Sequence, residues 1–214
     1  MLTDRDLANI MVGCYAYDGV AYPFDILHTE NDVYVGIKHF PDVDVVCFRG
    51  SVTFEDWVRD AIAVAPPCEH CVLGPIHEGA SLGIENVWKF FRPNLRPGFA
   101  VIGHSLGAMR ADIFSGFAVV DGCTPSLYVR WGEPRPGFQK LADILKDVPG
   151  RSYRNIGRHG HDYVTDVPFE FGPFQYVHPQ PLLDVTAEPA SDDHGTFAYH
   201  HMPLYRDAMK GVHA

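Results

Sequence analysis

The sequence contains no long hydrophobic run and no cluster of positive charge. Nowhere along its 214 residues does an apolar stretch approach the roughly 20 residues that a membrane-spanning helix needs. Lysine and arginine number 17 against 27 acidic residues, which gives a formal net charge of −10. This balance argues against a polyanionic partner, because binding to a phosphate backbone depends on Lys and Arg contacts. The composition therefore predicts no nucleic-acid partner and no stable membrane insertion.

The first residues do not have the pattern of an export signal, and the sequence contains five cysteines. Residues 1–6 contain no basic segment followed by an apolar run, so we expect no signal peptide and a protein that is cytoplasmic or released by a route not visible here. The five cysteines are an odd number, so at least one thiol lacks an intramolecular partner. Cys68 and Cys71 have the spacing of a metal half-site, a redox pair or a local disulfide. No second pair completes a zinc site, so we predict no metal and no other cofactor.

Strand-like and helix-like segments alternate over the central half of the chain. Strands are predicted at residues 33–38, 43–48, 100–102, 127–131 and 152–156, and helices at residues 3–17, 78–91, 138–146 and 203–209. We expect Leu82, Val87, Phe90 and Phe91 to form the inward face of the second helix, and residues 174–186 to form a terminal hairpin. The pattern predicts an α/β fold in a single domain, residues 1–214, with a mostly parallel central sheet and helices on both faces.

The most informative stretch is Gly103-His104-Ser105-Leu106-Gly107, which joins an apolar run to a helical segment. A Gly-x-Ser-x-Gly sequence between a strand and a helix places its serine on a sharp turn, and small flanking residues let the strand and helix approach closely. The backbone N–H of Leu106 would then lie at a helix N-terminus, where developing negative charge is favoured. The motif indicates a nucleophilic Ser105; an inert turn serine is the alternative.

A serine nucleophile needs a base, and the base needs an orienting carboxylate. The loop after the strand at 152–156 contains Asp162 and Asp166, and three histidines lie near the end of the chain: His194, His200 and His201. The order Ser, Asp, His along the chain is the order found in α/β-hydrolases.

These residues belong to a longer set of matching segments. The chain resembles the class 3 (fungal-type) lipases, a branch of the α/β-hydrolases. The resemblance is carried by Val46–Ser51, Asp56-Trp57, Cys68-x-x-Cys71, Ile76-His77-x-Gly79, Gly103–Ala108, Gly132–Gly137, His161–Pro168 and His200 with Tyr205. The matches fall in order along the chain and are together far more specific than any single motif.

The resemblance assigns roles to residues of this sequence. It implies a serine carboxylic-ester hydrolase with Ser105 as nucleophile, Asp162 as the orienting acid and His200 as the base. Backbone N–H groups of Ser51 and Leu106 would form the oxyanion hole. It also implies a small disulfide between Cys68 and Cys71. A non-catalytic binding protein and an amidase or peptidase with the same triad are the alternative functions.

The segment between Ser51 and Pro67 could form a short lid over the site; simple packing against the core is the alternative. It combines four apolar residues with four charged ones: Trp57, Val58, Ile62 and Val64, and Glu55, Asp56, Arg59 and Asp60. A short lid uncovers little apolar surface when it opens, which weakens docking to a lipid interface. We therefore expect a small ester or lipid substrate with short to medium acyl chains, and at most transient contact with a lipid surface.

Overall fold

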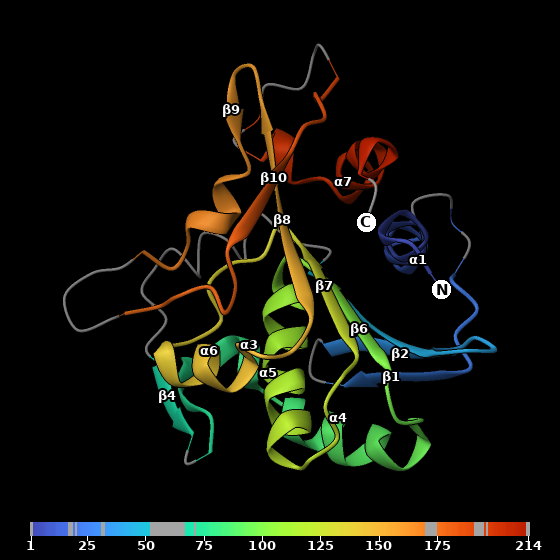
Figure 1. The fold of residues 1–214 in the computed structure, drawn as a ribbon. Coiled ribbons are helices and arrows are strands. Elements are labelled where there is room, and N and C mark those ends of the chain that lie inside the picture. Colours follow the sequence, from blue (N-terminus) through green and yellow to red (C-terminus); the bar gives the residue numbers. More distant parts are fainter. Residues whose placement is uncertain are drawn as a thin grey trace.

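A computed structural model of the chain describes residues 2–16, 19, 21–30, 33–51, 67–70, 72–169, 175–190, 195 and 197–212. The central sheet has the strand order β1-β2-β3-β6-β7-β8-β10, and β9 pairs with β8 (Figure 1). Its strands are β1 (Ile26–Glu30), β2 (Val33–His39), β3 (Asp44–Arg49), β6 (Ala100–His104), β7 (Leu127–Trp131), β8 (Gly150–Gly157), β9 (Gly160–His161) and β10 (Leu182–Val185). A separate antiparallel pair is formed by β4 (Pro67–His70) and β5 (Gly74–His77).

The strands from β3 to β10 along this order are parallel, whereas β1, β2 and β3 pair in antiparallel fashion. The α-helices are α1 (Asp4–Cys14), α3 (Glu78–Ser81), α4 (Ile84–Phe91), α5 (Leu106–Val120), α6 (Gln139–Leu145) and α7 (Met202–Ala208). Short 3-10 turns are η1 (Arg92–Asn94), η2 (Tyr163–Asp166), η3 (Ala198–His200) and η4 (Met209–Gly211). The predicted α/β class with a mostly parallel sheet is confirmed.

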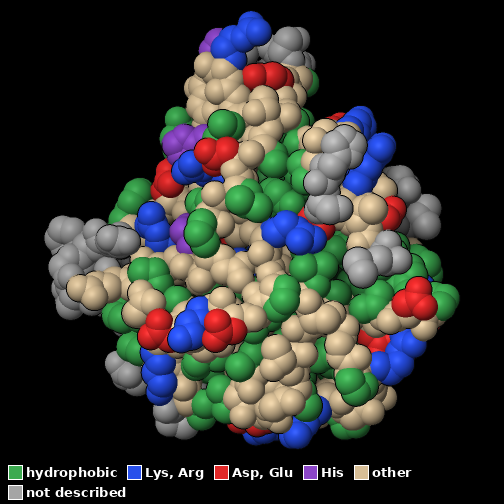
Figure 2. All heavy atoms as spheres, viewed as in Figure 1, with side chains coloured by type: hydrophobic (Ala, Val, Ile, Leu, Met, Phe, Trp, Pro, Cys, Tyr) green, Lys and Arg blue, Asp and Glu red, His purple; other side chains and the backbone are tan. Residues whose placement is uncertain are grey.

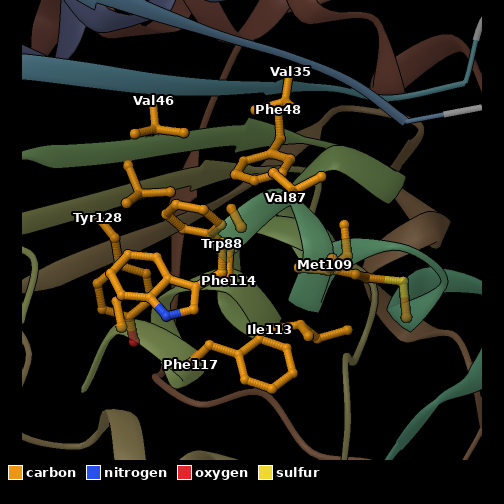
Figure 3. Close-up of a cluster of buried hydrophobic side chains, with 14 of the residues drawn as sticks. Val35, Val46, Phe48, Val87, Trp88, Met109, Ile113, Phe114, Phe117 and Tyr128 are labelled. Atoms are coloured by element: carbon orange, nitrogen blue, oxygen red, sulfur yellow. The ribbon is translucent and has the colours of Figure 1, made fainter. Parts of the chain in front are cut away.

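Two hydrophobic cores, one on each face of the sheet, hold the helices in place. Alternate residues of β3 point to opposite faces, so Val46 and Phe48 join one core while Val45 and Cys47 join the other. The first core packs α4, α5 and α6 against the sheet, with aromatic side chains of α5 and Trp88 of α4 at its centre (Figure 3). The second core packs α1 and α7, which lie side by side in Figure 1.

Two details of the predicted fold are wrong. Residues 182–185 form β10, which pairs in parallel with β8 and not in the predicted terminal hairpin. Leu82 and Phe90 are 57% and 49% exposed, although Val87 and Phe91 are buried as predicted. Gly83 takes a left-handed conformation (φ 78°) and separates α3 from α4, so Leu82 lies outside both helices. Within α4 the buried face consists of Ile84, Val87, Trp88 and Phe91, which leaves Phe90 on the outer face.

The surface in Figure 2 shows Lys and Arg side chains dispersed among acidic and apolar ones. Within the described ranges, no helix has both the length and the apolar character required to cross a bilayer. The same ranges bring no three His, Cys, Asp or Glu side chains into a cluster suited to a metal ion.

Candidate active site

Ser105 occupies the sharp turn between β6 and α5. Its backbone has φ 60° and ψ −134°, a conformation that L-residues rarely adopt and that is typical of strained functional turns. A side chain at Gly103 would collide with the carbonyl of Gly107, since an added Cβ would lie 2.4 Å from that oxygen. An added Cβ at Gly107 would lie 2.1 Å from the Phe48 carbonyl oxygen of β3. The two glycines are therefore required for the close packing of strand, turn and helix.

The Ser105 side chain is buried, with 1% of the residue exposed, and its Oγ has no hydrogen-bond partner among the residues described. The backbone N–H of Ser105 donates to the carbonyl of Trp131 at the end of β7, over 3.0 Å. This bond places the turn directly beside Gly132, the residue that follows Trp131.

Asp162 and His200 lie beside the same glycine and contact each other. The Nδ1–H of His200 donates to Oδ2 of Asp162 at 2.6 Å, and both side chains are buried. An added Cβ at Gly132 would lie 2.7 Å from Asp162 Oδ2 and 2.8 Å from His200 Nδ1. With its Nδ1 proton directed at the carboxylate, a neutral His200 carries its lone pair on Nε2, the nitrogen that a general base uses.

The Asp162 carboxylate accepts hydrogen bonds from two further groups. Tyr205 Oη donates to Oδ2 at 2.5 Å, and the backbone N–H of Val164 donates to Oδ1 at 3.0 Å. Burial raises the pKa of Asp162, but the nearby His200 and the hydrogen bonds from His200, Tyr205 and Val164 outweigh burial and lower it below its usual value. The carboxylate is therefore kept ionised, as needed to orient and stabilise an imidazolium.

A second set of hydrogen bonds connects the turn to helix α1. His104 Nε2 donates to the backbone carbonyl of His200 at 2.8 Å, and its Nδ1 accepts from the Tyr15 hydroxyl at 2.6 Å. The Tyr15 oxygen in turn accepts from the N–H of Gly50 at 3.0 Å. Burial lowers the pKa of His104 well below its usual value, so this histidine stays neutral and supports the turn through its two hydrogen bonds.

The two predicted oxyanion donors lie next to Ser105. Leu106 is the first residue of α5, so its N–H has no acceptor within the helix. Ser51 follows Gly50, whose added Cβ would lie 2.9 Å from Ser105 Cβ. The end of β3 and the start of α5 therefore meet at the serine, the arrangement that an oxyanion hole requires.

The alternative acid and bases have other positions. Asp166 Oδ2 pairs with His161 Nε2 at 2.7 Å and not with His200. His201 is exposed and directly precedes α7, and His194 lies outside the described residues. Arg135 braces the neighbouring loops through hydrogen bonds to the carbonyls of Asp166 and Pro168, at 2.5 and 2.8 Å.

Two sequence predictions fall wholly or partly outside the described residues. The lid segment is described only at Ser51 and Pro67. Cys71 is not described; Cys68 is a free thiol whose Sγ lies 3.3 Å from the Ser81 hydroxyl. As a free thiol, Cys68 does not form the disulfide with Cys71 that the resemblance implied.

Sequence reasoning missed three residues that contact this site. Tyr15 and Gly132 were given no role, and Tyr205 was noted only as part of the family-like segment that begins at His200. The Tyr15–His104 bond joins residues 89 positions apart, so no local pattern indicates it. Gly132 has φ +56°, and its position before Glu133-Pro134 in the family-like segment was the one available signal.

Comparison with known proteins places this arrangement in context. Residues 45–172 match the model of the family described as Lipase (class 3). Secreted mono- and diacylglycerol lipase A of Penicillium cyclopium and that of Penicillium camembertii are each 28% identical in an alignment of 185 positions, and the alignment covers 78% of this chain and 56% of each relative. The chain thus spans little more than half the length of these relatives.

Solved structures of fungal lipases share the fold. The lipase from Rhizopus microsporus var. chinensis superposes with a TM-score of 0.65 at 18% identity, covering 87% of this chain and 75% of that one. The mono- and diacylglycerol lipase from Aspergillus oryzae gives 0.60 at 22% identity, covering 78% and 65%. The family match extends over more than half of the sequence and includes both the Ser105 turn and Asp162. The chain belongs to the class 3 lipase family.

Proposed function

We propose that this chain is a serine carboxylic-ester hydrolase, a lipase or esterase in which Ser105, His200 and Asp162 form the triad. The observation that carries the proposal is the buried Asp162–His200 pair, joined at 2.6 Å beside the strained Ser105 turn. Ser105 Oγ attacks the ester carbonyl as His200 Nε2 takes its proton. The N–H groups of Ser51 and Leu106 stabilise the oxyanion.

The second half of the reaction uses the same groups. His200 returns its proton to the leaving alcohol, and the acyl group stays on Ser105. Water, deprotonated by His200, then attacks the acyl-enzyme, and the carboxylic acid leaves as Ser105 recovers its proton. Asp162 stabilises the imidazolium in both halves and itself stays ionised. Every step uses side chains and backbone groups of this chain.

The finer proposal concerns the substrate. We propose esters with short to medium acyl chains, including partial glycerides, as the substrate class. The names of the Penicillium and Aspergillus relatives support partial glycerides. The short, partly charged segment after Ser51 supports soluble esters over emulsified fat, because a small apolar lid gives little energy for docking to an interface.

Turnover of p-nitrophenyl esters tests the reaction. We expect Ser105→Ala to lower kcat by about a millionfold, to the limit of detection. Ser126→Ala, a matched serine substitution just before β7, should retain wild-type turnover, since the Ser126 hydroxyl donates to the carbonyls of Gly98 and Phe99, whereas the proposed site lies at the other end of β7. Wild-type turnover by Ser105→Ala would refute the proposed nucleophile.

A series of acyl chain lengths tests the substrate. We expect kcat/KM to fall beyond about eight to ten carbons, as the apolar surface available to the chain becomes limiting. Strong hydrolysis of triolein emulsions, rising sharply above the solubility limit, would contradict the short-lid interpretation while leaving the triad intact. Faster turnover of matched amides than of esters would instead favour an amidase or peptidase.

A further inference from the structure

Cys14 and Cys47 form a close pair of buried thiols away from the proposed triad. Cys14 lies at the C-terminal end of α1 and Cys47 in the middle of β3, with 2% and 0% of each residue exposed. Their sulfur atoms are 2.7 Å apart. This is about 0.7 Å longer than a disulfide bond, so little movement separates the two thiols from a covalent link.

We propose that Cys14 and Cys47 are a disulfide-forming pair that cross-links helix α1 to strand β3. The oxidant is a small-molecule disulfide. The thiolate of one cysteine attacks it, forming a mixed disulfide and releasing one small thiol. The thiolate of the other cysteine then displaces the second small thiol and closes the Cys14–Cys47 bond. The two protein thiols are oxidised, the small disulfide is reduced to two thiols, and the two cysteine protons pass to the released thiolates or to solvent.

The surroundings of the two thiols favour a bond between Cys14 and Cys47 over a bond to another cysteine. Both sulfurs already lie in the hydrophobic core between α1, α7 and the sheet, so forming a disulfide there buries no additional polar group. Cys14 Sγ otherwise contacts the Ile10 carbonyl at 3.1 Å, and Cys47 Sγ lies 4.0 Å from the sulfur of Met11. Cys68 and Cys123 are only half-buried.

Burial also determines when the bond forms. It raises the pKa of the Cys47 thiol well above its usual value, so the folded chain holds little reactive thiolate there. Oxidation is therefore fastest while α1 is still unpacked. Once formed, the buried bond resists reduction until α1 separates from the sheet.

The cross-link would lie close to the proposed oxyanion loop. Tyr15 follows Cys14 and accepts a hydrogen bond from Gly50, which lies three positions after Cys47. A bond between the two sulfurs therefore fixes both segments that meet at this hydrogen bond. The expected effect is resistance to heat, with activity at ordinary temperature retained in the reduced form.

Peptide mapping of the full chain tests the link directly. Trypsin places Cys14 in the peptide of residues 6–38 and Cys47 in the peptide of residues 39–49. The other three cysteines fall in two further peptides, residues 60–89 and 111–130. The chain is refolded in a glutathione redox buffer, quenched with acid, denatured, treated with N-ethylmaleimide and digested. We expect peptide 6–38 joined to peptide 39–49, with a mass about 2 Da below the sum of the reduced peptides. Complete alkylation of both cysteines in excess oxidised glutathione would overturn the proposal, as would pairing of either with another cysteine.

Thermal unfolding gives a second readout. It is measured in a Cys68→Ser protein, which cannot form a bond between Cys68 and Cys71. The Cys14–Cys47 bond closes a loop between residues 33 positions apart, and we expect oxidation to raise Tm by roughly 5–10 °C over the sample reduced after unfolding. Cys14→Ser and Cys47→Ser should abolish both the linked peptide and the redox dependence of Tm. Cys123→Ser, the matched control, should retain both. If the oxidised and reduced forms of the Cys68→Ser protein have the same Tm, the cross-link does not stabilise the fold.

Discussion

Two residues outside the proposed triad keep Asp162 and His200 in position. Gly132 leaves the space in which their side chains meet, and Tyr205 donates a hydrogen bond to the carboxylate. Neither takes part in bond making, so both act by positioning. Substitutions at these residues should therefore affect turnover more than substrate binding.

Gly132→Ala should lower kcat by at least a hundredfold, because its methyl group would lie 2.7 Å from both Asp162 Oδ2 and His200 Cε1. The matched control is Gly122→Ala. Gly122 has a similar left-handed backbone, with φ +73°, but nothing lies within 4 Å of an added Cβ. Both variants should lose about 1 kcal/mol of stability from the strained φ, and only Gly132→Ala should lose activity. Equal kcat values for the two variants would show that the close approach at Gly132 does not matter.

Tyr205→Phe should lower kcat about tenfold with little change in KM, since it removes a hydrogen bond to a charged carboxylate. It also raises the pKa of Asp162, because the Tyr205 hydroxyl is one of the groups that lower it. The part of acid inactivation that comes from protonation of Asp162 should therefore begin at a higher pH than in the wild type. A pH–rate profile that superposes on the wild-type curve would argue against this role.

At the scale of the elements, a buried ion cluster joins α5, β7 and the loop after β7. Arg130 Nε lies 2.9 Å from Glu133 and 3.3 Å from Asp112, and all three side chains are fully buried. The guanidinium also lies over the Tyr128 ring, 3.8 Å from its centre. Glu133 directly follows Gly132, so this cluster supports the turn against which the Asp162–His200 pair packs.

Arg130→Met should lower the free energy of unfolding by about 3–5 kcal/mol, because it leaves the ionised Glu133 carboxylate buried without its cation. Urea denaturation measures the change. Arg154→Met is the control: Arg154 pairs with Asp184 at 2.8 Å on the surface, and its loss should cost under about 1 kcal/mol. A loss of similar size in the two variants would mean that the buried cluster adds nothing beyond a surface pair.

The helices and strands that depend on interactions between residues close in sequence were predicted from local sequence patterns. Thr3 and Asp6 form a reciprocal cap at the start of α1, and the apolar runs of β3, β6 and β7 alternate between the two cores. The parallel pairing of β10 with β8 was missed because it depends on residues 30 positions apart. Likewise, the sequence predicted Ser105, Asp162 and His200 as a set, but not Tyr15, whose contacts arise only after α1 packs on the sheet.

At the scale of the whole molecule, the excess of acidic groups makes stability depend on pH. Asp44 is fully buried and accepts hydrogen bonds from the backbone and side chain of Arg96. Burial raises the pKa of Asp44, but the bonds from Arg96 and His39 lower it to about 2. The folded-state pKa therefore lies below the value of about 3.9 in an unfolded chain.

A group with a lowered folded-state pKa stabilises the fold above its unfolded pKa. Asp44 therefore stabilises the fold fully above pH 4, and this stabilisation is lost between about pH 4 and pH 2. Its size is roughly 2 kcal/mol at most, because the half-exposed Arg96 is screened by water. Urea unfolding across this range should show a decline that becomes shallower in Asp44→Asn. An unchanged slope in that variant would assign the decline to other carboxylates.

The central claim is that Ser105 is a nucleophile activated by the His200–Asp162 pair, and labelling with a fluorophosphonate tests it most directly. The tryptic peptide 90–110 contains Ser105 and no other serine, so an adduct in this peptide identifies the residue. The account predicts stoichiometric labelling of this peptide in the wild type and in Ser126→Ala. It predicts no labelling in Ser105→Ala, and labelling slowed at least a thousandfold in His200→Ala. A folded wild-type chain that resists the probe, or that is labelled outside this peptide, would contradict the claim and favour a binding protein built on the lipase fold.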